Sequence, residues 1–140
     1  NLLDEKECQW NLALLWPDQP ERIERFKSAL LLLESTPIVF LKGSGNEVLT
    51  QAASQIPGDR LLCVMHSFTL NQFSQSDREV FDGIITEISK TRDIWRVGIE
   101  WISTPYPELV ISQYSLGKTV LRQKVAECGS HGDWIRWLPT

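Results

Sequence analysis

Residues 60–82 read RLLCVMHSFTLNQFSQSDREVFD, and this stretch decides the fold. Leu61–Met65 is an apolar run of the length of a buried strand. Ser76 and Glu79 then have the spacing of a capping box, which marks the start of a helix. Ligands of parallel α/β sheets bind just beyond the carboxyl ends of the strands. The polar pair His66-Ser67 at the end of this strand is therefore where a site is expected.

Alternating strands and helices extend in both directions from this stretch. Apolar side chains at helical spacing predict helices after Asp4, after Asp18 and from Asn46 to Ile56, and apolar runs predict further strands at 38–41 and 94–102. Parallel neighbours cannot be joined by a tight turn, so strands that alternate with helices predict three parallel strands.

The region after residue 102 differs in kind. Residues 109–114 and 119–125 flank the short turn 115–118 and predict an antiparallel hairpin. The expected fold class is α/β and Rossmann-like, with a mostly parallel sheet of about five strands, helices on its faces and this hairpin at its C-terminal end. Residues 1–140 are expected to form a single α/β domain.

Composition narrows the classes of protein and partner. The chain has 140 residues, and its 14 Lys and Arg against 18 Asp and Glu leave a net charge of -4, which lacks the basic footprint of a nucleic-acid-binding protein. Ala29–Leu33, among the longest apolar runs, falls far short of the about 20 residues that cross a bilayer. Neither nucleic acid nor a membrane is an expected partner.

The cysteines indicate a reducing compartment. Cys8, Cys63 and Cys128 cannot all pair within one chain, and none has C-x-x-C spacing, so a reduced, cytoplasmic protein is expected. No ligand spacing supports a metal site. The chain begins at Asn1 rather than at methionine, from which we expect it to be the C-terminal part of a longer protein.

The sharpest candidates for catalysis are His66 and Glu100. Successive strand residues point to opposite faces, so His66 and Ser67 make a poor base and nucleophile, and no G-x-S-x-G elbow supports a serine hydrolase. Glu100 follows an apolar strand, where burial would raise its pKa toward that of a general base. If their strands are parallel neighbours, about 5 Å apart, the two side chains share a pocket that a small molecule would occupy.

His66, Ser67 and Glu100 could instead have purely structural roles. His66 and Ser67 would then satisfy local backbone groups at the end of the strand. Glu100 would form an ion pair with Arg96 or Lys90, or would be exposed.

A second candidate site follows the predicted strand at 38–41. Lys42 and Gly43 precede a predicted helix, where backbone N–H groups could cradle an anion, and they join Ser67 as candidate cofactor-binding residues. The segment matches neither the Walker A motif nor G-x-G-x-x-G. A simple strand-to-helix turn is the favoured alternative.

Four motifs, in order, resemble the bacterial DUF2332 family, a domain of unknown function. They are Trp16-Pro17-Asp18-Gln19, the strand ending in His66-Ser67, Gly98-Ile99-Glu100 and His131-Gly132-Asp133-Trp134. In the family an Asn precedes the Glu of the third motif, whereas this chain has Ile99. The resemblance covers nearly the whole chain, corresponds to the C-terminal part of longer members, and implies no established activity.

The chain is more distantly similar to class I S-adenosylmethionine-dependent methyltransferases, whose later half also alternates strands and helices before an antiparallel pair. Their first strand and glycine-rich turn, which bind the cofactor, are absent from these residues. The similarity implies S-adenosylmethionine binding only together with a missing N-terminal part, so the cofactor of this chain is left unknown. It also implies either a rearranged strand order or a homodimer through an exposed sheet edge.

Two functions are therefore expected. The first is an enzyme-like, methyltransferase-related domain that acts in the complete protein. The alternative is a non-catalytic α/β domain for binding or assembly.

Overall fold

The structure, a computed structural model, describes residues 4–139, which belong to two units, 1–40 and 41–140. The first unit consists of α1 (Glu5–Ala13) and α2 (Pro20–Ser35). Asp4 caps α1 as expected, since its carboxylate accepts hydrogen bonds from the backbone of Lys6 and Glu7. Pro20 occupies the first turn of α2, where its missing N–H costs nothing.

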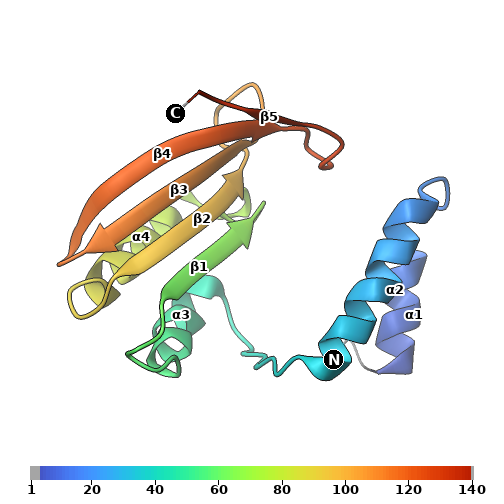
Figure 1. The fold of residues 1–140 in the computed structure, drawn as a ribbon, viewed down its shortest axis with the longest axis horizontal. Coiled ribbons are helices and arrows are strands. Elements are labelled where there is room, and N and C mark those ends of the chain that lie inside the picture. The colour runs from blue at the N-terminus through green and yellow to red at the C-terminus, as the bar shows by residue number, and fades with distance from the viewer. Residues whose placement is uncertain (1–3, 140) are drawn as a thin grey trace. The chain divides into compact units, whose positions relative to one another are not determined.

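The second unit is a five-stranded sheet with two α-helices (Figure 1). Its elements in chain order are α3 (Gly45–Ser54), β1 (Leu62–Ser67), the 3-10 helix η1 (Leu70–Gln72), α4 (Gln75–Ile88), β2 (Ile94–Glu100), β3 (Glu108–Ser115), β4 (Lys118–Cys128) and β5 (Ile135–Trp137). The strands lie side by side in chain order, so each strand pairs with the next.

The α/β class is confirmed, but the expectation of a mostly parallel sheet was wrong. Among the described residues only β1 and β2 are parallel, and the other three neighbouring pairs are antiparallel. The chain leaves β2 and enters β3 through residues 101–107 without a helix, and so short a connection returns the strand in the opposite direction. The Rossmann-like arrangement is not confirmed.

The predicted strand at 38–41 does not form. These residues have no regular secondary structure, and Val39 and Phe40 are largely exposed. An apolar, β-branched segment becomes a strand only beside a partner, so its composition alone did not decide its conformation. The antiparallel hairpin is confirmed: Leu116 and Gly117 both have positive φ, 51° and 73°, as the two central residues of a type I′ turn require.

The core of this unit lies between α3, α4 and one face of the sheet (Figure 1). Alternate strand residues point to this face, and they pack against apolar residues of both helices. The buried cluster consists of Ala53, Leu62, Leu70, Phe81, Ile85, Ile94 and Tyr114. On the other face of β1, Met65 is 76% exposed. β1 is also an edge strand of the sheet, where the expected homodimer contact stays a prediction.

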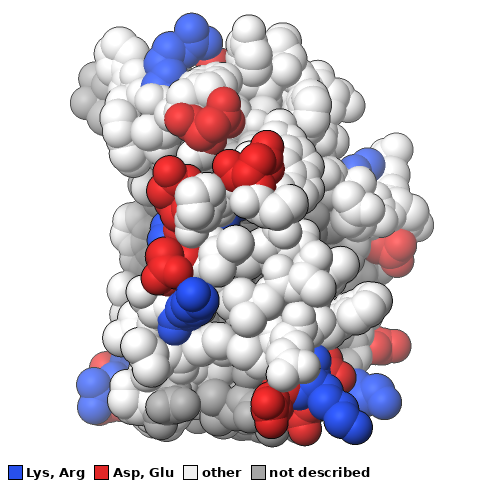
Figure 2. Space-filling view, turned by 90° about the vertical axis from the view of Figure 1, so that its right-hand side faces the viewer, with Lys and Arg blue, Asp and Glu red and all other residues white. Residues whose placement is uncertain are grey.

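The structure gives two observations on a membrane and on nucleic acid as partners. No helix among residues 4–139 has both the length and the apolar character needed to cross a bilayer. On the face shown in Figure 2, Lys and Arg occur in small groups near Asp or Glu, and most of the surface is uncharged. This face thus presents no continuous basic surface, although the absence of a nucleic-acid partner stays a prediction.

Truncating Ile85 tests the placement of the core. Ile85 is fully buried, so Ile85→Ala should lower the free energy of unfolding by about 2–5 kcal/mol, measured by urea denaturation. Val80→Ala, at a 51% exposed position of the same helix, is the control and should cost less than about 1 kcal/mol. Equal losses would contradict this core.

Candidate functional site

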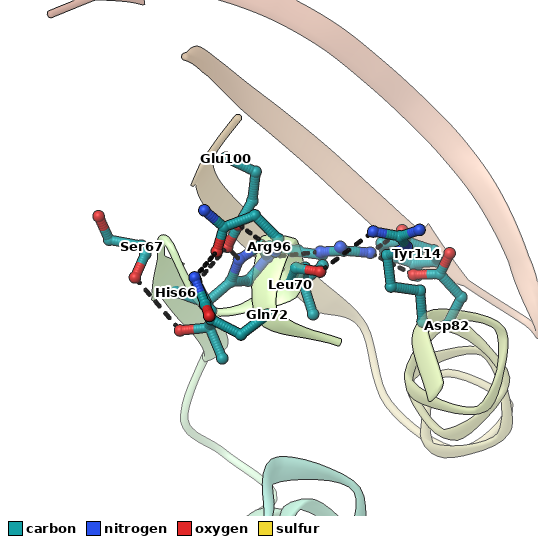
Figure 3. Close-up of polar contacts among 11 residues, drawn as sticks. His66, Ser67, Leu70, Gln72, Asp82, Arg96, Glu100 and Tyr114 are labelled. Atoms are coloured by element: carbon teal, nitrogen blue, oxygen red, sulfur yellow. Dashed lines mark hydrogen bonds and ion pairs between the residues drawn. The ribbon is translucent and has the colours of Figure 1, made fainter. Parts of the chain in front are cut away.

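A polar cluster forms where β1 and β2 end, on the face that the helices cover (Figure 3). His66 of β1 lies directly beside Gly98 of β2, and alternation places Arg96 and Glu100 on the same face, one on each side of Gly98. The imidazole therefore lies between a guanidinium and a carboxylate. Its Nδ1 is 2.7 Å from Oε1 of Glu100, and its Nε2 is 2.9 Å from Nε of Arg96.

These contacts determine the tautomer of His66. The Nε of Arg96 can only donate, so Nε2 of His66 must accept and carries no proton. Nδ1 then holds the proton and donates it to Glu100. Burial lowers the pKa of His66 below its ordinary value, and the charge of Arg96 acts in the same direction, outweighing the hydrogen bond to Glu100. The imidazole is therefore neutral at pH 7.

Gly98 gives the imidazole its space. A Cβ on Gly98 would lie 2.8 Å from Nε2 of His66 and closer still to Cε1. No side chain larger than hydrogen fits under the ring, which makes this glycine a requirement of the His66 contacts.

Glu100 is held on both carboxylate oxygens. Besides the contact with His66, it accepts hydrogen bonds from the backbone N–H of Thr69 at 3.0 Å and of Asn71 at 3.1 Å, at the start of η1. Burial alone would raise the pKa of Glu100, but the hydrogen bonds from His66 and from the backbone of residues 69–71 outweigh burial and lower it. The expectation of a raised pKa was therefore wrong. Glu100 is an ionised acceptor in this structure.

Arg96 is 8% exposed, and its charge is compensated from α4. Its Nη1 lies 2.6 Å from a carboxylate oxygen of Asp82 and 3.3 Å from the hydroxyl of Tyr114. Its guanidinium also lies over the ring of Phe81, 5.2 Å from the centroid. The suggested pairs of Glu100 with Arg96 or Lys90 do not form: Arg96 pairs with Asp82 and Lys90 with Glu87.

A cavity of about 230 Å³ adjoins this cluster. It spreads from the strand ends over the start of β3 and the middle of β4. Its polar lining includes His66, Arg96, Glu100, Glu108, Ser112 and Arg122, and its apolar lining includes Leu70, Ile102 and Val110. Most small-molecule sites are lined mainly by apolar side chains, whereas polar and charged side chains predominate here, which suits a polar ligand.

The other predicted site residues lie elsewhere. Ser67 points to the opposite face from His66, is exposed and does not line the cavity (Figure 3). Lys42 and Gly43 precede α3, and the N-terminus of that helix is capped by its own Glu47, whose carboxylate accepts from the backbone of Ser44 at 2.8 Å. Lys42 and Gly43 thus belong to a turn that leads into α3 with no strand before it, and neither residue lines the cavity.

Sequence reasoning missed several residues of the site. Arg96 and Gly98 were not predicted as site residues, although they recur with the predicted Glu100 at every second position of one strand, a period that places all three on one face. Asp82, Tyr114, Ser112 and Arg122 had no such signal, because their positions depend on how α4, β3 and β4 pack and pair.

The architecture and the site together define a mixed α/β domain with a buried polar cluster and a cavity at the carboxyl ends of its parallel strand pair. The family model of an uncharacterized protein conserved in bacteria, DUF2332, matches residues 1–137, so the chain belongs to this family. No curated protein and no solved structure matches it. The similarity to methyltransferases thus has no support from these comparisons.

Substitution of Gly98 tests the His66 contacts. Gly98→Ala should displace the imidazole and lower the free energy of unfolding by about 1–3 kcal/mol, as overpacking does. Gly83→Ala is the matched control: it lies in α4 with open space around its Cβ position and should leave stability unchanged or raise it by up to about 1 kcal/mol. Equal effects in chemical denaturation would show that the ring does not lie over Gly98.

The pKa of His66 predicts how stability depends on pH. The unfolded state, with a histidine pKa near 6.5, binds the proton more readily than the folded state, so stability is fully present above that pH and is lost as pH falls below it. Glu100 adds a second loss as pH falls below 4.5, its value when unfolded. Urea denaturation between pH 8 and 5 should show the first loss, which His66→Gln abolishes and His131→Gln retains. A stability that rises between pH 7 and 5 would contradict the assigned neutral imidazole.

Proposed function

We propose that residues 41–139 form a non-catalytic binding domain, and that its ligand is a small polar organic molecule held in the cavity beside His66. The observation that carries this proposal is the commitment of both ring nitrogens of His66 next to an open cavity. A general base needs a free lone pair within reach of the substrate. Nε2 of His66 already accepts from Arg96, so the imidazole serves as a wall of the cavity.

The rigidity of this wall favours binding. Glu100, His66, Arg96 and Asp82 form a continuous chain of hydrogen bonds from η1 to α4. Binding costs less when the site is already ordered, because few side chains then lose rotational freedom. The volume of about 230 Å³ suits a metabolite-sized ligand rather than a dinucleotide.

An enzyme-like, Rossmann-related domain is the second proposal, and β1–α4–β2 favours it. This parallel unit carries the polar cluster at its carboxyl ends, where such folds bind ligands. Under this proposal S-adenosylmethionine binds to the complete protein, together with an N-terminal part, and these 140 residues alone give no heat of binding in calorimetry. A cytoplasmic location belongs to both proposals.

A cavity-filling variant tests the binding proposal. Thermal-shift screening with amino acids, hydroxy acids, nucleosides and sugars should give compounds that raise the melting temperature, since a ligand of the folded state stabilises it. Val110→Phe places a larger side chain in the cavity and should weaken their binding at least about tenfold, by about 1.4 kcal/mol. Ile111→Phe, one residue along β3 and on the other face, is the control. The proposal fails if no compound binds or if both variants bind equally well.

A further inference from the structure

Three neighbouring strands place Arg96, Ser112 and Arg122 in one row across the cavity. Arg96 of β2 is the register partner of Ser112 of β3, and Ser112 is the register partner of Arg122 of β4. Adjacent strands lie about 4.8 Å apart, so the hydroxyl is within a few ångströms of both guanidinium-bearing strands. All three residues line the cavity.

Ser112 is the least expected member of this row. The residue as a whole is 2% exposed, it lines the cavity, and its hydroxyl makes no hydrogen bond to another side chain or backbone group of residues 4–139. Among the described residues, Asn46 Oδ1 is the one fully buried side-chain oxygen or nitrogen without a partner, so the hydroxyl of Ser112 is open to the cavity, where water bonds it. A ligand that enters the cavity can replace this water and accept a hydrogen bond from Ser112.

Arg96 and Arg122 both have guanidinium N–H groups that do not bond another residue. Arg122 is exposed at the cavity, and its side chain makes no ion pair or hydrogen bond with another residue in the described part of the chain. Arg96 uses Nε for His66 and Nη1 for Asp82 and Tyr114, while its Nη2 has no bond to any described group. By contrast, the nearby Lys124 is paired with both Glu108 and Glu127. Unpaired donors therefore gather along the Arg96–Ser112–Arg122 row.

We propose that this row is an anion subsite, and that it recognises the carboxylate of a small monocarboxylic acid. The planar guanidinium of Arg122 matches two carboxylate oxygens, and the Ser112 hydroxyl donates to one of them. The cavity also contains Glu100 and Glu108, whose negative charges disfavour a phosphate dianion and favour a ligand that carries one negative charge. This proposal rests on the binding function proposed above and names the class of ligand.

Titration of isotope-labelled protein with small anions tests this subsite. Acetate, L-lactate, glycine and inorganic phosphate are the probes, and the amide signals of residues 112 and 122 are followed by NMR. The carboxylates should give saturable shifts centred on these residues. Arg122→Gln and Ser112→Ala should weaken that binding at least about tenfold, Arg122→Lys should weaken it less, and Lys118→Gln, at the far end of β4, should not change it.

The stability of Ser112→Ala separates a ligand-binding hydroxyl from a structural one. Removing a hydroxyl that only water in the cavity bonds should change the melting temperature of the free protein by less than about 2 °C and should reduce the rise that a carboxylate produces. A structural serine instead gives a larger fall in the melting temperature without ligand and an unchanged response to it.

The outcomes distinguish this proposal from the one on which it rests. If ligands found by screening lose affinity in Val110→Phe but not in Arg122→Gln, the cavity binds them and the anion subsite is wrong. Tighter binding of phosphate than of carboxylates at the same residues overturns the assigned class. Shifts that do not saturate and spread over many surface residues also overturn it. If nothing binds in the cavity, both proposals fail together.

Discussion

The contact of His66 with Arg96 and Glu100 is the constraint on which the site depends. One imidazole satisfies a buried guanidinium and a buried carboxylate at once, because its two nitrogens have opposite hydrogen-bonding roles. Neither charge would be stable alone: each burial costs several kcal/mol, and Asp82 and the backbone of η1 supply the remaining partners. This contact requires a neutral ring, a glycine beneath it and a parallel register of β1 with β2.

Two sets of polar side chains line this cavity: the hydrogen-bonded cluster around His66, and the row formed by Arg96, Ser112 and Arg122. The His66 cluster has its hydrogen bonds complete without any ligand, so it orders the wall and leaves little to donate. The side chains of Ser112 and Arg122 differ: they line the cavity, Arg122 is exposed, and neither bonds another side chain of residues 4–139. Binding energy comes from groups that gain partners, so the ligand that we propose would be recognised by Arg96, Ser112 and Arg122 rather than by His66.

Local signals in the sequence were sufficient for the helices and for part of the sheet. Apolar spacing and prolines predicted α1 to α4, and the turn at Leu116-Gly117 predicted the hairpin. The cap at Asp4 is confirmed, but the predicted capping box of Ser76 and Glu79 was wrong, because Ser74 caps α4. Apolar runs predicted three strands, and two of them formed, at Leu62–Ser67 and Ile94–Glu100. The run at 38–41 did not, because a strand depends on a neighbour that composition does not reveal.

The sequence predicted only those site residues that lie at the carboxyl ends of strands. His66 and Glu100 were found because both follow apolar runs, and parallel pairing brings such ends together. The pKa of Glu100 was assigned in the wrong direction, because the backbone donors of Thr69 and Asn71 come from a 3-10 turn with no sequence signature. Ser112 and Arg122 required the register of β3 with β4, which shifts twice along the hairpin.

The departure from a parallel sheet builds the cavity. In a parallel sheet, the site at the carboxyl ends is completed by loops. Here β3 runs back from the end of β2, so its first residues, Glu108 to Ser112, lie directly beside residues 96–100 of β2 and one strand further from β1. Rigid strand positions, held by their own ladder of hydrogen bonds, thus line the cavity where a loop would otherwise stand. A site built on strands holds its groups in fixed positions, which suits recognition of a small ligand more than chemistry that needs a loop to close.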